Sequence, residues 1–218
     1  MDFAPPEKPQ SELSEEDLSQ IRNETSINDK IRITPPAELT VNDINRIMGY
    51  YAEAAERCLR AGMDMVLIHG AHEMFISHFL SPHKNKRTDK YGGSVENRSR
   101  FVIELLEAIR ARIGGNMAIE YRLSAEELTP SGPSLEDTLR FAELIQDKID
   151  ILHVSAGTLS DDQIMGNVIQ PTYYERGLNV HYAEQFKKRL SIPVTTVGSL
   201  NIDLAEKVIA SGKADMVA

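Results

Sequence analysis

Short apolar runs alternate with longer amphipathic segments over most of this sequence, and this alternation most constrains its fold. Five runs are too short for helices and apolar on both faces, as is typical of parallel strands covered by helices: residues 63–68, 117–123, 151–154, 194–197 and 216–218. Apolar residues at helical spacing occupy the other segments: residues 40–61, 94–113, 134–147, 180–190 and 202–210. Strands and helices in regular alternation predict a parallel α/β fold.

The number of strands leaves two architectures open. A closed (β/α)8 barrel needs eight strands and about 250 residues, so five strands correspond either to an open sheet or to part of a barrel. Residues 1–38 contain no strand-like run and are interpreted as a polar, loop-rich amino-terminal segment with one short helix near residues 15–23. The α/β pattern occupies residues 39–218.

Composition argues against several classes of function. The formal net charge is −9, and Lys and Arg are scattered among acids, so a surface that binds nucleic acid is not expected. No apolar run approaches the ~20 residues that cross a bilayer, and the acidic, proline-bearing start is not a secretory signal. Cys58 is the only cysteine, which excludes an internal disulfide and favours a reducing, cytoplasmic compartment.

Two histidines follow the first apolar run. In parallel α/β proteins the working groups lie at the carboxyl ends of strands, which makes His69 and His72 the first candidates. Their rings could hold a carbonyl oxygen or an oxyanion. Structural hydrogen bonding and a metal site with His78 remain alternatives, although the His-Glu-x-x-His zinc pattern fails because Ile76 occupies the place of its second histidine.

A longer series of motifs resembles the old yellow enzyme family, and most closely its NADH:flavin oxidoreductase, enoate reductase and 2,4-dienoyl-CoA reductase branches. The motifs are HGAH at 69–72, FLSP at 79–82, NKRTDKYGG at 85–93, ENRSRF at 96–101, YRLS at 121–124, HVSAG at 153–157 and GKADMVA at 212–218. They occur in the family's order at plausible spacings. The resemblance covers about residues 35–218.

The resemblance implies a fold, cofactors and an activity. The fold would be a (β/α)8 TIM barrel that is incomplete, with about strands four to eight present, so that residues 39–218 form a partial FMN-binding barrel domain. The implied activity is hydride transfer from NADH or NADPH through FMN to an electron-poor acceptor such as an α,β-unsaturated carbonyl. An iron–sulfur cluster is implied only for a longer gene product. The expected partner is a small-molecule substrate, with no nucleic acid and no membrane, and a homo-oligomer is left open.

The resemblance also implies roles for particular residues. The positions of His69 and His72 bind the oxygen of the substrate, or of the nicotinamide amide, above the flavin. Arg122 corresponds to the strand-five arginine that reaches the N1–C2 edge of the flavin, where a positive charge would stabilise the anionic reduced ring. Gly198 and Ser199 look like part of the phosphate site that barrels build from late loops, and a plain tight turn is the alternative.

The sequence departs from the family pattern in two places. Glu73 and Met74 stand where the family usually has Gly-Tyr, whose tyrosine donates a proton to the substrate. A thioether cannot donate one, so the proton would come from Glu73, from a loop tyrosine such as Tyr173 or Tyr174, or from water.

The second departure is the missing front of the barrel. It predicts a truncated chain whose open sheet edges favour aggregation. The alternative function is an inactive half-barrel remnant, or a partner-binding subunit, that cannot hold FMN. A third alternative is a flavodoxin-like open sheet. A barrel aldolase is disfavoured, because it would need a lysine at a strand end to form a Schiff base and no strand here ends in lysine.

Overall fold

Five parallel strands form one sheet in the part of the chain that the computed structural model describes, residues 38–218. The strands are β1 (Met65–Gly70), β2 (Ala118–Ser124), β3 (Ile151–Ser155), β4 (Val194–Thr196) and β5 (Met216–Val217). They lie side by side in the order β1-β2-β3-β4-β5. The expectations for residues 1–37, including the short helix near residues 15–23, lie outside the described residues.

The strand order decides between the architectures that the sequence left open. A doubly wound sheet, as in flavodoxin, reverses its strand order at a switch point. Here each strand pairs with the next one along the chain without any reversal. Sequential parallel pairing is the order of a β/α barrel, so the flavodoxin-like alternative is wrong for these strands.

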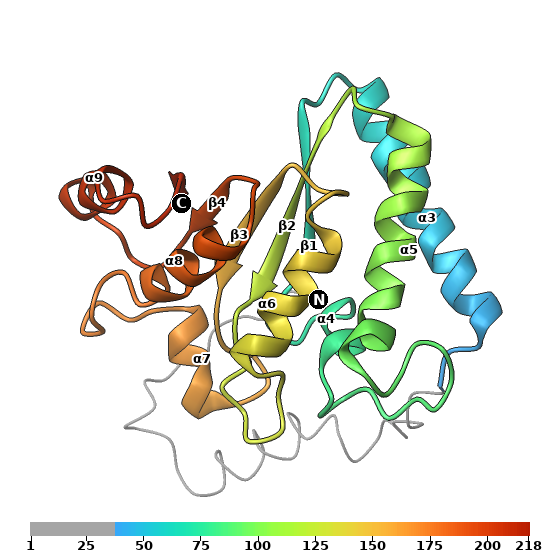
Figure 1. Ribbon diagram of the computed structural model, residues 1–218, viewed down its shortest axis with the longest axis horizontal. Helices are drawn as coiled ribbons and strands as arrows, with labels where there is room; N and C mark the ends of the chain where they lie inside the picture. Colours follow the sequence, from blue (N-terminus) through green and yellow to red (C-terminus); the bar gives the residue numbers. More distant parts are fainter. Residues whose placement is uncertain (1–37) are drawn as a thin grey trace, which may run out of the picture. The chain divides into compact units, whose positions relative to one another are not determined.

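The helices predicted from apolar spacing are all present. The helices are α3 (Val41–Arg60), α5 (Val95–Ile113), α6 (Leu135–Ile145), α8 (Val180–Arg189) and α9 (Ile202–Ala210). Two short helices were not predicted, α4 (Ser77–Leu80) and α7 (Asp162–Val168), and both follow strands at the end to which the arrows point in Figure 1. None of the helices in residues 38–218 is long and apolar enough to cross a bilayer.

Local side chains fix where several helices begin. The Ser94 hydroxyl accepts a hydrogen bond from the Asn97 amide at 3.3 Å and caps α5. Ser134 caps α6 in a reciprocal capping box with Asp137. These bonds satisfy amide groups that the first turn of a helix leaves without partners.

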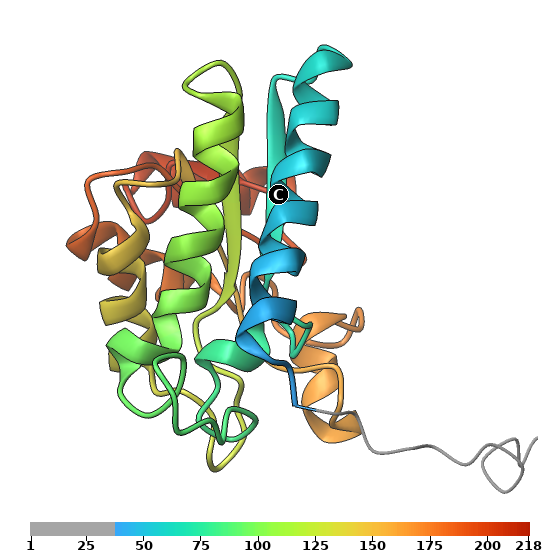
Figure 2. The same cartoon turned by 90° about the vertical axis from the view of Figure 1, so that its right-hand side faces the viewer.

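The two faces of the sheet have different surroundings. On one face a row of apolar side chains from β1 to β4 is buried: Ile68, Tyr121, Leu152 and Val194. Helices α3, α5, α6 and α8 lie beside this face in turn (Figures 1 and 2). The opposite face, called the inner face below, carries the alternate residues: Met65, Leu67 and His69 of β1, Glu120, Arg122 and Ser124 of β2, His153 and Ser155 of β3, and Thr195 of β4.

Gly70 ends β1 where the next strand crowds it. A Cβ atom at this position would lie 1.9 Å from the hydroxyl oxygen of Tyr121. The Tyr121 side chain is fully buried and packs against Phe141, with 5.6 Å between the ring centroids. The absence of a side chain at Gly70 therefore leaves room for the Tyr121 ring, immediately after His69 and before the loop that carries His72.

Candidate active site

Strand register places three basic side chains in one row across the inner face. His69 of β1 lies opposite Arg122 of β2, and Arg122 lies opposite His153 of β3. Thr195 of β4 continues the row. The sequence placed His69 just after the first apolar run; β1 extends two residues beyond that run, so His69 is part of the sheet. The pairing of β1 with β2 therefore determines which residues lie beside His69.

His72 is held next to this row by a network of hydrogen bonds. Its ring centroid lies 5.1 Å from that of His69. The His72 amide donates to the Ser124 hydroxyl at 2.9 Å, and Ser124 in turn donates to the Gly157 carbonyl at 3.0 Å. The Nε2 atom of His72 lies 2.8 Å from the Ser155 hydroxyl. The backbone of His72 has φ +59°, the left-handed conformation that turns the chain sharply after β1.

Burial and one guanidinium control protonation at this site. Burial, followed by the positive charge of Arg122, lowers the pKa of His72 to about 3. The same two causes lower the pKa of His69. Both rings are therefore neutral at pH 7, and each can donate one N–H. Burial also lowers the pKa of Arg122 itself, an effect that the Glu120 carboxylate opposes.

Several buried nitrogen atoms in the row have no hydrogen-bond partner within residues 38–218. They are Nδ1 of His69, Nε of Arg122 and Nε2 of His153. Buried polar groups nearly always find partners, because leaving one unpaired costs about 1–3 kcal/mol. Three such atoms on one face fit the binding of a polar, planar ligand that supplies both hydrogen-bond donors and acceptors.

Sequence reasoning missed Glu120 and His153. The Oε1 atom of Glu120 lies 3.0 Å from Nδ1 of His153, and both side chains are buried. The signal was available: Glu120 precedes Arg122 by two residues and so shares its face, and His153 is a basic residue within an apolar strand. His153 was read as part of an apolar run and of the HVSAG motif, and the direction of its side chain was not considered.

The remaining predicted positions, Gly198 and Ser199, form the turn after β4. Their backbones have φ +139° and +49°, respectively. The Gly198 carbonyl accepts from the Gly177 amide at 2.8 Å, and the Ser199 carbonyl accepts from the Arg176 guanidinium at 3.2 Å. The turn therefore lies at the carboxyl end of a strand beside a cation, but its residues are not part of the histidine–arginine row.

Glu73 is committed to other side chains. Its carboxylate forms an ion pair with Lys84 and accepts hydrogen bonds from the hydroxyls of Thr158 and Ser160. Only 7% of the Glu73 side chain is exposed. Tyr173, a second candidate proton donor, is 83% exposed. Glu73 thus ties the loop after β1 to the loop after β3, and this role opposes its use as a free acid.

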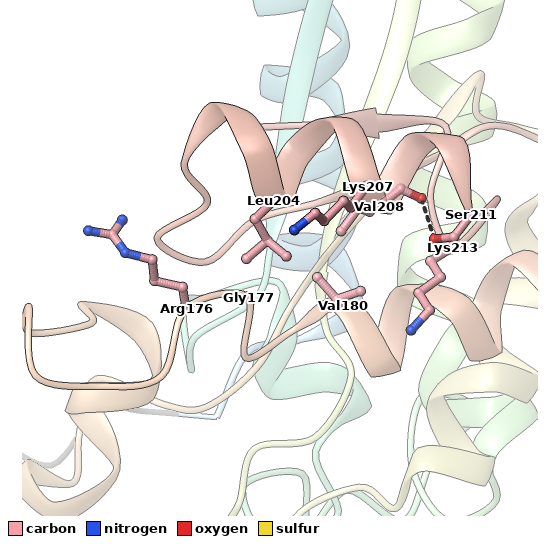
Figure 3. Close-up of a pocket in the computed structure, with 8 residues that line it drawn as sticks. All are labelled: Arg176, Gly177, Val180, Leu204, Lys207, Val208, Ser211 and Lys213. Carbon is pink, nitrogen blue, oxygen red and sulfur yellow. Dashed lines mark hydrogen bonds between the residues drawn. The ribbon is translucent and has the colours of Figure 1, made fainter.

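Two other features do not mark the site. Figure 3 shows a pocket of about 140 Å³ between α8 and α9, into which Leu204 and Val180 project. Its Arg176 guanidinium points away from Lys207 and Lys213, so the three cations do not converge on one ligand. Among residues 38–218, no group of three or more His, Cys, Asp or Glu side chains is arranged to hold a metal ion.

The sequential parallel pairing of the five strands, with polar side chains at their carboxyl ends, defines the class of β/α-barrel proteins. More specifically, the chain belongs to the NADH:flavin oxidoreductase / NADH oxidase family, whose sequence model matches residues 5–218. The five strands are accordingly part of a (β/α)8 TIM barrel, about strands four to eight, which confirms the fold that the resemblance implied.

Individual relatives support the same family. An NADH oxidase of Thermoanaerobacter brockii is 41% identical over 187 residues, which are 85% of this chain and 28% of that protein. An NADPH dehydrogenase of Clostridium acetobutylicum is 37% identical over 84% of this chain and 52% of its own length. The old yellow enzyme homologue of Zymomonas mobilis superimposes with a TM-score of 0.66 and 26% identity over 83% of this chain and 48% of that one. The chain thus spans about half, or less, of the length of these relatives.

Proposed function

We propose that this chain functions in an FMN-dependent oxidoreductase that takes hydride from NADH or NADPH and passes it to an electron-poor acceptor such as an α,β-unsaturated carbonyl. Membership of the family supports flavin-dependent oxidoreduction, and its relatives include an NADH oxidase and an NADPH dehydrogenase. The observation that carries the proposal is the row of His69, Arg122 and His153, with its unpartnered buried nitrogen atoms. The partner would be a small molecule, in a cytoplasmic setting.

Arg122 is assigned to the flavin ring. FMN, when bound, supplies the ring that accepts a hydride and donates it again. The Nε–H of Arg122 is buried without a partner, so it can donate to an acceptor at the edge of the ring. Its positive charge favours negative charge on that edge. The carboxylate of Glu120, two residues earlier on the same face, raises the pKa of the guanidinium and so opposes the effect of burial.

His69 and His72 are assigned to the oxygen of the substrate. Both are neutral at pH 7, so each donates one hydrogen bond and neither brings a positive charge that would attract stray anions. If the Ser155 hydroxyl donates to Nε2 of His72, the proton of His72 resides on Nδ1 and remains free for the substrate. Ser155 would then select the tautomer that the chemistry needs.

Gly198 and Ser199 are assigned to the phosphate of FMN. Their turn follows the strand next to β3, and barrels often bind phosphate with late loops. The Arg176 guanidinium beside Ser199 adds a positive charge to the same turn. The proton that alkene reduction needs is left to water or to a loop tyrosine, since the carboxylate of Glu73 is engaged by Lys84.

The competing proposal is a half barrel that does not hold FMN. Two residues favour the half barrel. Glu73 is held in an ion pair with Lys84, and Met74 carries a thioether, so neither can replace the family's tyrosine as proton donor. Both proposals retain the fold. They differ in whether the chain binds flavin.

Flavin titration of the 218-residue chain tests the proposal. Quenching of FMN fluorescence is expected to saturate at one flavin per chain, and Arg122→Met is expected to weaken binding roughly tenfold, the value of one charge-assisted hydrogen bond. Arg46→Met is the matched control, since Arg46 lies on α3 with a 62% exposed side chain that pairs with Asp43. Absence of saturable binding by the wild-type chain favours the half barrel.

A further inference from the structure

A buried acid–base pair lies on the inner face, formed by Glu120 of β2, two residues before Arg122, and His153 of β3. Glu120 is 8% exposed and His153 is 6% exposed. Between these neighbouring strands, Oε1 of Glu120 lies 3.0 Å from Nδ1 of His153. Burying two ionisable groups is unfavourable unless they satisfy each other. Here the pairing accounts for only one of the two ring nitrogens, because Nε2 of His153 is buried without a partner in the described part of the chain.

The pairing fixes which ring nitrogen carries the proton. An ionised carboxylate can only accept, so Nδ1 of His153 donates to Glu120, and in the neutral ring Nε2 is left with a lone pair. The charged and titratable groups around His153 are Glu120 and Arg122 of β2, His69 of β1 and His72 of the following loop. Burial, with the charge of Arg122, lowers the pKa of His153, so the neutral form predominates at pH 7.

A hydrogen-bond acceptor at Nε2 of His153 complements the donors in the rest of the row. Arg122 presents an N–H donor, and neutral His69 and His72 can each present one. These donors suit the carbonyl oxygens and anionic edges of a ligand. His153 instead needs a ligand that donates. A flavin nucleotide has two kinds of such group, the imide N–H of its ring and the hydroxyls of its ribityl chain.

We propose that His153 is a further cofactor-contacting residue, whose Nε2 accepts a hydrogen bond from the imide or a ribityl hydroxyl of FMN, and that Glu120 is its positioning residue. This inference rests on the proposed function and adds to it. It assigns contacts with the flavin to two neighbouring strands, a hydrogen-bond donor from β2 and an acceptor from β3. The resemblance implied only Arg122 as a contact with the flavin ring.

The experiment compares Glu120→Gln with the double variant Glu120→Gln, His153→Leu. Glutamine retains an oxygen that accepts from Nδ1, so E120Q keeps His153 in place, while the double variant removes the ring without stranding a buried carboxylate. Binding is therefore compared with E120Q rather than with wild type, and the double variant is expected to bind FMN roughly tenfold more weakly than E120Q. Thermal melts followed by circular dichroism show first that both variants fold.

Lumiflavin, which lacks the ribityl chain, separates the two donors. An equal loss with lumiflavin and FMN identifies the ring imide, and a loss confined to FMN identifies a ribityl hydroxyl. If the double variant binds both flavins as E120Q does, the contact is overturned while the proposed function stands. If the wild-type chain binds no flavin, the proposed function fails, and this inference fails with it.

A second measurement does not depend on the double variant folding. In the full chain labelled with ¹⁵N-histidine, the His153 signals are assigned by their loss in His153→Gln. The expected spectrum has a protonated Nδ1 and a bare Nε2, and FMN is expected to shift the Nε2 resonance toward the range of a hydrogen-bonded acceptor. A protonated Nε2, or a resonance that saturating FMN does not move, overturns the proposal.

Discussion

His72 shows how the surroundings of one residue set its chemistry. It is the most buried of the three histidines of the site, at 3% exposure, and its pKa is lowered to about 3. In an unfolded chain the same ring would titrate near 6.5. Between these two values the unfolded state binds a proton that the folded state does not. The folded state therefore loses stability as the pH falls from about 6.5 toward 3.

This linkage predicts a difference between variants. His72→Asn removes the titrating ring, and asparagine tolerates the left-handed backbone at this position. The free energy of unfolding of wild type should fall more steeply below pH 6.5 than that of H72N, by about 1.4 kcal/mol per pH unit for one proton. Urea titrations between pH 4 and 7, followed by circular dichroism because the chain has no tryptophan, measure both slopes.

His78→Asn supplies the control for this prediction. His78 lies on the exposed side of α4, outside the row, so its replacement controls for the loss of one histidine elsewhere in the chain. Parallel curves for H72N and wild type would show that His72 titrates normally in the folded chain, and would remove the basis for a neutral donor at this position.

At the scale of elements, two glycines predict opposite responses to the same substitution. Gly70→Ala places a methyl group 1.9 Å from the Tyr121 hydroxyl at the join of β1 and β2, and should destabilise the fold by about 1–3 kcal/mol. Gly49→Ala lies within α3, where a Cβ atom would meet nothing within 4 Å. It should stabilise by up to about 1 kcal/mol, since alanine is the better helix former.

Urea midpoints of the two variants test the pair. G70A should unfold at a lower urea concentration than wild type and G49A at a higher one. If G70A retains the midpoint of wild type, then Tyr121 can move aside, and room for its ring is not what requires glycine at this position.

The strands and long helices were predictable because their apolar periodicity is strong. The short helices and the long-range side-chain contacts were not predictable. Helices α4 and α7 are short, and α7 buries no residue, so no apolar periodicity marks it. The network around His72 joins residues 52 and 83 positions away in the sequence. Contacts of that range depend on strand register, which apolar runs specify only to within a residue or two. The side chains at 69, 72 and 122 could be named from motifs, but Glu120 and His153 emerged only from the register.

At the scale of the whole molecule, the inner face is open beside β1 within residues 38–218. Among residues 38–218, β1 pairs only with β2, which leaves the other edge of β1 without a strand. Met65 and Leu67 on its inner face are 43% and 42% exposed. An open parallel edge beside exposed apolar side chains is a template for pairing with another chain. The 218-residue chain should therefore self-associate as its concentration rises.

Leu67→Lys tests whether this edge is responsible. A lysine that points inward at an open edge disfavours pairing, because association would bury its charge. Ile209→Lys is the matched control: Ile209 is 41% exposed, but it lies in the last turn of α9, away from β1. Sedimentation over a range of concentrations should show a mass that rises for wild type and I209K and stays lower for L67K. If wild type remains a monomer throughout, the edge is protected, and the inner face that we assign to flavin is less accessible than its exposed side chains imply.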